Sequence, residues 1–245
     1  MRIAVVSDIH GNLTALEAVV ADLRKASPDL VLHGGDLADS GSSPVDVVDR
    51  IRGLGWQGVM GNTDEMLVQP EALGEFAAQS KAPAALWAAV REIAEATRVR
   101  LGEKRLAWLR TLPAVRIEPE LDPGFALTHA SPTSCWRPPA ADASDEELEA
   151  TYGSLRAPVV VYGHTHLPSV RNLSGTLRML INSGSAGLPF DGDPRASYLQ
   201  LDGGAATIRR VEYNLETELK LLEWCGLPGA AWTAKMLRAR GPMMP

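Results

Sequence analysis

The sequence predicts an α/β protein in which helices alternate with the strands of a mostly parallel sheet. Three observations lead to this prediction. The first 60 or so residues alternate short apolar runs with amphipathic stretches, residues 65–113 have an almost entirely helical pattern, and the chain from Val115 onward is rich in short strands. The 245 residues contain no repeat and no flexible linker, so we predict a single domain, 1–245, with a helical cap insertion over about 65–113.

The first part of the chain contains three predicted strands, each rich in β-branched or large apolar residues and each ending in polar residues. These strands are RIAVVSD (2–8), PDLVLHGGD (28–36) and WQGVMGNTDE (56–65). Residues 12–26 and 43–55 lie between them and carry apolar side chains at helical spacing. In the second of these, Pro44 follows Ser43, a favourable start for a helix. Strand, helix, strand, helix, strand indicates βαβ units.

The later part of the chain contains five predicted strands, separated by turns with Gly or Pro. They are residues 124–132, 157–168, 178–187, 196–202 and 205–213. In the cap, Pro83 is expected to break the helical pattern, while Trp87 and Trp108 are expected in the core of the cap. A C-terminal helix is expected over about 215–240 and should pack on the body of the domain.

Charge and composition narrow the possible functions. With 24 Lys and Arg against 30 Asp and Glu, the formal charge of −6 argues against an extended nucleic-acid surface or an anionic membrane surface. No apolar run approaches the roughly 20 residues that span a bilayer. Cys135 and Cys225 lie far apart and form no metal-binding spacing. We therefore expect a cytoplasmic protein that makes no membrane contact.

Polar side chains with metal-binding chemistry follow five of the predicted strands. The residues in question are Asp8, His10, Asp36, Asn62, His129, His164 and His166. The carboxyl ends of strands in an open α/β sheet converge on one crevice, so these side chains are expected to meet. Within the pairs Asp8/His10 and His164/His166, residues two apart on extended chain project to the same side and can reach a common site.

Seven ligands are too many for one zinc ion, which takes about four, and they suit two ions that share a bridging carboxylate. The oxygen and nitrogen donors, with no thiolate, favour Mn²⁺, Fe, Zn²⁺ or Ni²⁺ over Ca²⁺. Each residue has an alternative explanation: Asp8 or Asp36 could cap a helix, Asn62 could occupy a turn, and His129 could be a hydrogen-bonded interior histidine. These alternatives do not account for four of the five histidines lying at strand ends.

The blocks DIHGN, GGDL, GNTDE, THASP and GHTH, in this order over residues 8–166, resemble the calcineurin-like metallophosphoesterase superfamily of bacterial and archaeal type. INSGSAG at 181–187 resembles a further block of the family. The resemblance implies a four-layer α/β/β/α sandwich of two mixed sheets. It also implies one ion held by Asp8, His10, Asp36 and His166 and another held by Asp36, Asn62, His129 and His164, with Asp36 bridging. Two divalent transition-metal ions are expected, Mn²⁺ first among them.

The same resemblance implies a phosphodiesterase that hydrolyses a small-molecule phosphate ester or nucleotide by attack of a metal-bridging hydroxide. Asp36, Asn62 and His129 are the implied catalytic residues. The alternatives are a dinucleoside polyphosphate hydrolase, a protein or small-molecule phosphomonoesterase, and a catalytically weak scaffold of the same fold.

Thr63 stands where many members of the family carry a histidine that can protonate the leaving group. Threonine has no suitable pKa for this task, so we expect better activity on esters with good leaving groups than on alkyl monoesters. Substrate specificity is expected to be set by the cap.

Overall fold

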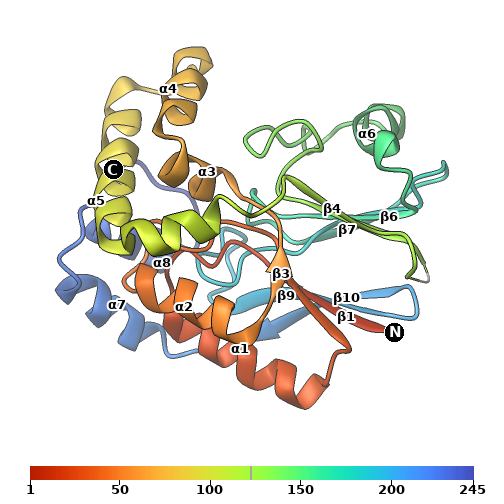
Figure 1. The fold of residues 1–245 in the computed structure, drawn as a ribbon, viewed down its shortest axis with the longest axis horizontal. Helices are drawn as coiled ribbons and strands as arrows, with labels where there is room; N and C mark the ends of the chain where they lie inside the picture. The colour runs from red at the N-terminus through yellow and green to blue at the C-terminus, as the bar shows by residue number, and fades with distance from the viewer. Residues whose placement is uncertain (122) are drawn as a thin grey trace.

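The computed structural model of the protein describes residues 1–121 and 123–245, which form two five-stranded mixed sheets (Figure 1). The first sheet has the order β10-β9-β1-β2-β3. Its strands are β1 (Arg2–Val6), β2 (Leu30–His33), β3 (Gln57–Gly58), β9 (Ala196–Asp202) and β10 (Ala205–Val211). The second sheet has the order β4-β5-β6-β8-β7. Its strands are β4 (Val115–Glu118), β5 (Phe125–Thr128), β6 (Val159–Tyr162), β7 (Ser169–Asn172) and β8 (Met179–Asn182).

Each sheet has a parallel centre and antiparallel flanks. In the first sheet β1, β2 and β3 run parallel, and β9 runs antiparallel to β1. In the second, β5, β6 and β8 run parallel, and the edge strands β4 and β7 run antiparallel to their neighbours. Of the predicted third strand, only Gln57–Gly58 pairs, because its polar end already begins a helix at Asn62.

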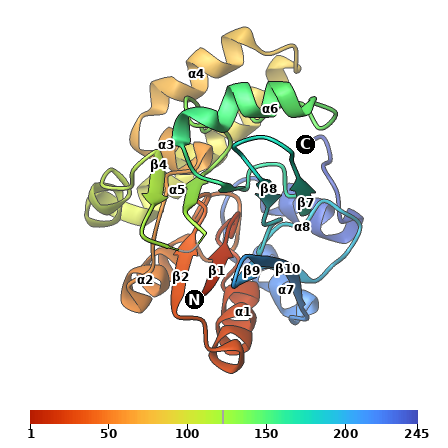
Figure 2. The same ribbon diagram turned by 90° about the vertical axis from the view of Figure 1, so that its right-hand side faces the viewer.

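The two sheets pack face to face between outer layers of helices, which confirms the four-layer α/β/β/α sandwich (Figure 2). The period of two along β1 shows how the layers arise. Ile3 and Val5 point between the sheets, whereas Ala4 and Val6 point toward the helices on the outer face. Those helices are α1 (Leu13–Ala26) and α2 (Pro44–Leu54).

The helix α6 (Asp145–Tyr152) covers the outer face of the second sheet, where Leu148 and Tyr152 pack with β5 and β6. We did not predict this helix. The sequence signals the start of this helix with Ser144 followed three residues later by Glu147, the pattern of a capping box. In the structure Ser144 accepts a hydrogen bond from the Glu147 backbone, and the Glu147 side chain accepts one from the Ser144 backbone.

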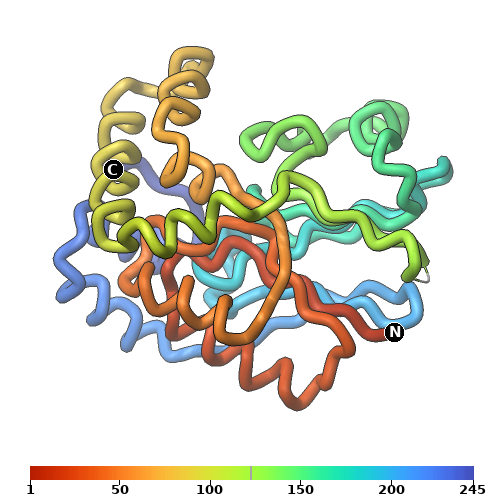
Figure 3. The backbone as a smooth tube through the Cα atoms, in the orientation of Figure 1, coloured from red at the N-terminus to blue at the C-terminus, as the bar shows by residue number. Residues whose placement is uncertain are grey.

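The cap consists of α3 (Asn62–Val68), α4 (Pro70–Gln79) and α5 (Ala84–Leu109), with Pro83 directly before α5 as the break. The helix α5 is interrupted at Gly102, where the backbone leaves helical geometry with φ 68°. Trp108 packs in the core formed with α1 and α2. In Figure 3 the yellow helix α5 and the blue C-terminal segment lie at the same end of the molecule.

The segment 215–240, expected to be one helix, contains two, α7 (Leu215–Trp224) and α8 (Ala230–Ala239). The break lies at Gly226 and Gly229, which both have positive φ, with Pro228 between them. A helix cannot continue through left-handed backbone and a proline. Within the described residues, no helix combines the length and the apolar character needed to cross a membrane.

Candidate metal centre

The carboxyl ends of strands from both sheets place the seven candidate ligands in one region. Asp8 and His10 follow β1, Asp36 follows β2, and Asn62 is the first residue of α3 after β3. His129 directly follows β5, and His164 and His166 follow β6. The seven side chains therefore meet at the ends of these strands, as the sequence predicts.

Four of these residues form a tight buried group. The ligand atoms of Asp8, His10, Asp36 and His166 all lie within 4.8 Å of one another. His166 Nε2 is 3.3 Å from Asp8 Oδ1 and 3.1 Å from His10 Nε2. His10 Nε2 is in turn 3.5 Å from Asp36 Oδ2. This is the set expected for the first ion.

A second group forms around Asn62. Its Oδ1 lies 2.8 Å from His164 Nδ1 and 3.0 Å from His129 Nε2. His129 Nε2 also lies 3.5 Å from Asp36 Oδ1. Asp36 Oδ2 therefore faces the first group and Asp36 Oδ1 faces the second, as a ligand shared between two ions requires.

The hydrogen bonds of three imidazoles indicate which nitrogens face the centre. In His10, His129 and His166 the Nδ1 atom contacts a backbone carbonyl oxygen, which can only accept. The carbonyls belong to Asp39 at 3.2 Å, Gly34 at 2.7 Å and Leu188 at 2.6 Å, respectively. In the neutral ring Nδ1 then carries the proton and Nε2 presents its lone pair, the arrangement typical of metal-binding histidines. The two lone pairs of His10 and His166 face each other, which is unfavourable unless a metal ion or a shared proton lies between them.

The charge balance of the region also fits bound cations. Asp8, Asp36, Asp39 and Asp64 are all buried there. Among the described residues, no Lys or Arg forms a salt bridge with any of the four, and the basic side chains that contact Asp8 and Asp36 are histidines. Buried carboxylates without a counter-charge are costly, and divalent cations would supply that charge. Oxygen and nitrogen donors without a thiolate suit Mn²⁺, Fe or Zn²⁺.

The pKa directions show the same demand for positive charge. Burial raises the pKa of Asp39 to about 7. Burial, followed by the charge of Asp36, raises the pKa of Asp64 to about 7 as well. Although burial disfavours the imidazolium, the Asp36 carboxylate raises the pKa of His129 to about 10. Without cations, protons would have to neutralise this region.

Five candidate ligands have left-handed backbone. The φ angles are 55° at Asp8, 48° at His10, 54° at Asp36, 64° at His164 and 59° at His166. The expectation that Asp8/His10 and His164/His166 project from extended chain is therefore wrong, because these residues lie in tight turns after their strands. The ligand atoms meet mainly between pairs, as in the Asp8–His166 contact. Such backbone strain is concentrated at functional sites in proteins.

Two glycines beside the ligands permit close approach of the chain. A Cβ on Gly61 would lie 2.1 Å from Asp36 Oδ1. A Cβ on Gly163 would lie 2.4 Å from Asp8 Oδ2. Any side chain at either position would displace a candidate ligand, so the glycines in the GNTD and GHTH blocks serve the packing of the centre.

Asp64 and Ser185 support the centre, and neither was predicted. The Asp64 carboxylate accepts hydrogen bonds from the backbone N–H groups of Asp36 (2.8 Å), Leu37 (3.0 Å) and Gly61 (3.1 Å). Ser185, in the INSGSAG block, donates to the Asp8 backbone oxygen at 2.6 Å. The signal for Asp64 was its position as the third residue of a helix that starts at a predicted ligand.

Two further residues whose side chains could bind a metal or a phosphate, His33 and Arg195, lie outside the centre. His33 is fully buried against Trp108, with ring centroids 6.2 Å apart, and neither ring nitrogen has a hydrogen-bond partner in the described structure. Burial lowers the pKa of His33 to about 3 and keeps the ring neutral. Arg195 is an exposed residue whose guanidinium pairs with Asp193.

A cavity of about 490 Å³ opens onto the centre. Its inner end is formed by His10, Asp36, Asn62, His164 and His166. Its outer walls come from the cap and from α8 with the residues after it. Trp87, expected in the core of the cap, lines this cavity.

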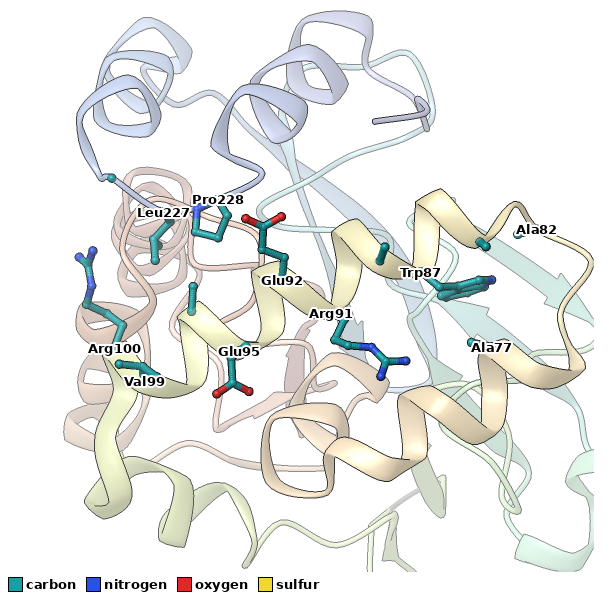
Figure 4. Close-up of a pocket in the computed structure, with 14 residues that line it drawn as sticks. Ala77, Ala82, Trp87, Arg91, Glu92, Glu95, Val99, Arg100, Leu227 and Pro228 are labelled. Atoms are coloured by element: carbon teal, nitrogen blue, oxygen red, sulfur yellow. The ribbon is translucent and has the colours of Figure 1, made fainter.

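A larger groove of about 1370 Å³ runs along α5 and contains none of the seven candidate ligands (Figure 4). Alanines, the charged residues Arg91, Glu92, Glu95 and Arg100, and the Leu227–Pro228 turn are among the residues that line it. Nothing in this groove offers the chemistry found at the strand ends, so the smaller cavity is the candidate active site.

Comparison with known proteins agrees with the geometry. A family profile described as a calcineurin-like phosphoesterase superfamily domain matches residues 1–204. The uncharacterized protein MJ0912 of Methanocaldococcus jannaschii is 31% identical over 91% of this chain and 95% of its own length.

Two solved structures resemble the whole chain. A metallophosphoesterase from Sphaerobacter thermophilus is 27% identical with a TM-score of 0.76, covering 98% of this chain and 100% of its own. The hypothetical protein PH1004 from Pyrococcus horikoshii OT3 is 17% identical with a TM-score of 0.82, covering 99% of each chain. The second likeness concerns the fold alone.

Proposed function

Because the chain belongs to the calcineurin-like phosphoesterase superfamily, we propose that it is a dimetal-dependent phosphodiesterase acting on a small phosphate ester or nucleotide. The observation that carries the proposal is the position of Asp36, whose two carboxylate oxygens face two separate groups of ligand atoms. A carboxylate shared in this way is suited to a pair of ions, and a pair of ions is suited to in-line displacement at phosphorus.

The residues divide into two ligand sets. Asp8, His10 and His166 would hold one ion, and Asn62, His129 and His164 the other, with Asp36 common to both. When bound, divalent ions such as Mn²⁺ activate water as a nucleophile and neutralise charge on phosphate oxygens. The backbone carbonyls of Asp39, Gly34 and Leu188 fix the orientation of the rings of His10, His129 and His166, respectively. Asp64 fixes the loop that carries Asp36.

Thr63 defines the class of ester that the site should favour. It lines the cavity, and its Oγ1 is buried without a hydrogen-bond partner in the described structure. The hydroxyl can donate a hydrogen bond to a phosphate oxygen but cannot deliver a proton to a poor leaving group. Aryl diesters, whose leaving groups need no proton, are therefore better substrates than alkyl monoesters.

A non-catalytic scaffold role accounts poorly for this centre. A scaffold needs neither four buried carboxylates nor five ligands in left-handed conformations. Both features cost stability, and binding of cations is the function that they serve.

The test uses protein stripped with a chelator and reconstituted with Mn²⁺. Its kcat/KM is measured for bis(para-nitrophenyl) phosphate, an alkyl monoester and diadenosine tetraphosphate. The diester should be preferred over the alkyl monoester by more than about tenfold, since general acid catalysis alone contributes about 100-fold or more. Equal kcat/KM values for the two would contradict the assignment, and preference for diadenosine tetraphosphate would favour a polyphosphate hydrolase instead.

The matched variant is Asp36→Asn, which keeps the shape of the side chain and removes its charge. Loss of an outer hydrogen bond alone costs metal sites about 10- to 100-fold, so loss of the shared ligand should cost more than about 100-fold in kcat/KM. Circular dichroism should show an unchanged fold. Full activity of this variant would be incompatible with a dimetal mechanism.

A further inference from the structure

The cavity above the metal centre, called here the substrate chamber, changes abruptly from polar to apolar. Beyond the candidate ligands its walls carry five aromatic side chains, Phe76, Trp87, Trp136, Phe190 and Trp232. Met66, Met236, Met243 and Met244 fill the spaces between them. Aromatic and thioether groups together form a surface that favours flat apolar ligands.

The aromatic wall starts at the metal centre itself. The ring of Phe190 stacks on His166, with centroids 4.4 Å apart and an angle of 24° between the planes. On the cap side, Phe76 stacks on Trp136 at 4.8 Å and meets Trp87 edge-on at 5.6 Å. A group bonded to a phosphate at the centre would therefore enter a space with rings on both sides.

The charges around the chamber limit the substrate further. None of the residues that line it, all within the described part of the chain, is Lys or Arg. Asp36 and Asp39 are among the lining residues, and their carboxyl groups offer no attraction to further phosphate groups. A second or third phosphate group reaching into the outer part would meet no lining Lys or Arg, and its desolvation would oppose binding. The Arg137 guanidinium lies 5.1 Å from the Phe76 ring centroid but does not line the chamber.

The outer wall opposite the cap comes from α8 and the residues that follow it, 240–244, named here the C-terminal wall. Thr233 Oγ1 on α8 donates to the backbone oxygen of Ser40, in the loop after the ligand Asp36, at 2.7 Å. Trp232 Nε1 donates to the Met243 backbone oxygen at 2.8 Å and so holds the segment beside the helix. Gly192 N donates to the Arg240 backbone oxygen at 3.1 Å.

The C-terminal wall is held by these hydrogen bonds, and part of its apolar surface is exposed. Met243 and Met244 line the chamber, but 45% and 54% of their surface is exposed. The wall also lies beyond residue 204, where the match to the family profile ends. It borders the chamber from a part of the chain that the family profile does not match.

We propose that the substrate chamber binds an uncharged aromatic group of a phosphodiester that carries a single phosphate, and that Trp232 and Met243 of the C-terminal wall are specificity-determining residues. This inference rests on the phosphodiesterase function proposed above and names the substrate class of that site. A nucleobase is a poorer occupant than a plain aryl group, because its polar edge atoms would face apolar walls and lose their hydrogen bonds to water.

Binding of two phosphonates that the enzyme does not hydrolyse tests the chamber directly. Phenylphosphonate and methylphosphonate carry the same anionic head and differ only in the aromatic group. Calorimetric titration of Mn²⁺-loaded protein should give a Kd for phenylphosphonate about tenfold lower, because burying a ring removes apolar surface from water. Equal Kd values would overturn the inference.

Variants of the C-terminal wall locate the effect. Trp232→Ala should reduce the preference for phenylphosphonate by about threefold or more and leave the Kd of methylphosphonate unchanged. Met243→Ala, at a half-exposed position where folding is not at risk, should reduce it in the same direction. The matched control is Trp224→Ala, since Trp224 on α7 is 76% exposed and lies outside the chamber. An unchanged preference in both wall variants would show that the wall does not determine specificity.

Turnover separates this inference from the proposed function. The para-nitrophenyl esters of phenylphosphonate and methylphosphonate share one leaving group, so their kcat/KM ratio reports on the second substituent alone. Turnover of both at equal kcat/KM would contradict the aromatic chamber and leave the phosphodiesterase intact. No turnover of either ester, with tighter phenylphosphonate binding retained, would contradict the phosphodiesterase instead. A higher kcat/KM for thymidine para-nitrophenyl phosphate than for phenyl para-nitrophenyl phosphate, two phosphodiesters with the same leaving group, would overturn the assignment to a plain aryl group.

Discussion

Asp36 combines several unfavourable features in one residue. It is buried, negatively charged and held at a φ of 54°. Left-handed backbone at a non-glycine residue costs of order 1 kcal/mol or more, and removing a carboxylate from water costs several, of which the neighbouring His129 imidazole offsets a part. The same features place both of its oxygens at the junction of the two ligand groups. Geometry suited to the ions thus comes at the expense of the stability of the ion-free protein.

Glu218 on α7 is a further buried carboxylate, which is not one of the candidate ligands, and it makes the stability of the fold depend on pH. Burial raises its pKa above the ordinary value of 4.5, and Thr14 Oγ1 donates to it at 2.8 Å. Below 4.5 the group is protonated in both the folded and the unfolded chain. As the pH rises through the raised folded pKa, the unfolded chain releases its proton more readily, so the protein loses stability.

Glu218→Gln should therefore remove this loss. The free energy of unfolding of the variant minus that of the wild type, both measured with urea between about pH 4 and pH 8, should increase as the pH rises. Glu216→Gln, at an exposed position in the same helix, is the control and should follow the wild type. A constant difference between Glu218→Gln and the wild type across the range would argue against titration of Glu218.

For single residues, the sequence predicted the candidate ligands, because they recur at the ends of strands. It did not predict residues whose role depends on contacts that form only in the folded chain. The seven candidate ligands follow strands, and that placement can be read along the chain. Asp64 acts through three backbone N–H groups, two of which belong to another loop. The left-handed conformations of Asp8 and His166 likewise depend on turns whose geometry the residue types alone do not specify.

Among the elements, the short helix α3 has the largest effect on the centre for its length. It begins with the candidate ligand Asn62, and its third residue, Asp64, binds the loop that carries Asp36. One helical turn thus connects the end of β3 to the end of β2. The position of Asn62 relative to Asp36 depends on this connection.

Asp64→Ala should break this connection between the end of β3 and the end of β2. Three buried N–H groups would lose their acceptor, at about 1–3 kcal/mol each, so the free energy of unfolding should fall by about 3 kcal/mol or more. Asp64→Asn retains one acceptor oxygen and should fall by less. Urea unfolding of the metal-free proteins provides the comparison, which excludes effects of metal affinity. Equal stability of Asp64→Ala and the wild type would show that water replaces the carboxylate.

The helical elements also show where prediction from sequence ends. The cap pattern at 65–113 and the break at Pro83 were visible as periodicity, and the structure has helices there. The docking of α8 on the loop after Asp36 was not visible, because an amphipathic pattern indicates which face is buried but not the surface that covers it. For this reason specificity was expected from the cap alone, although Trp232 and Met243 line the same chamber.

For the whole molecule, the centre is a junction between the two sheets. Asp8, His10, Asp36 and Asn62 follow strands of the first sheet, whereas His129, His164 and His166 follow strands of the second. The apolar layer between the sheets, with Val5, Leu32 and Val161 among its members, holds them face to face along their length. Ions at the junction would join the sheets at one end as well.

Bound metal should therefore stabilise the entire fold rather than one loop. A ligand at 100 times its Kd adds about 2.7 kcal/mol to the free energy of unfolding, which corresponds to a Tm increase of about 5–10 °C in a protein of this size. Mn²⁺ added to chelator-treated protein should produce this shift in calorimetry as one cooperative transition. Ca²⁺, which prefers oxygen ligands, should produce a smaller one, and Asp36→Asn should lose most of the Mn²⁺ effect. A Tm that Mn²⁺ leaves unchanged, or raises equally in Asp36→Asn, would mean that these side chains do not bind the ions jointly, and the junction would then be held by protein contacts alone.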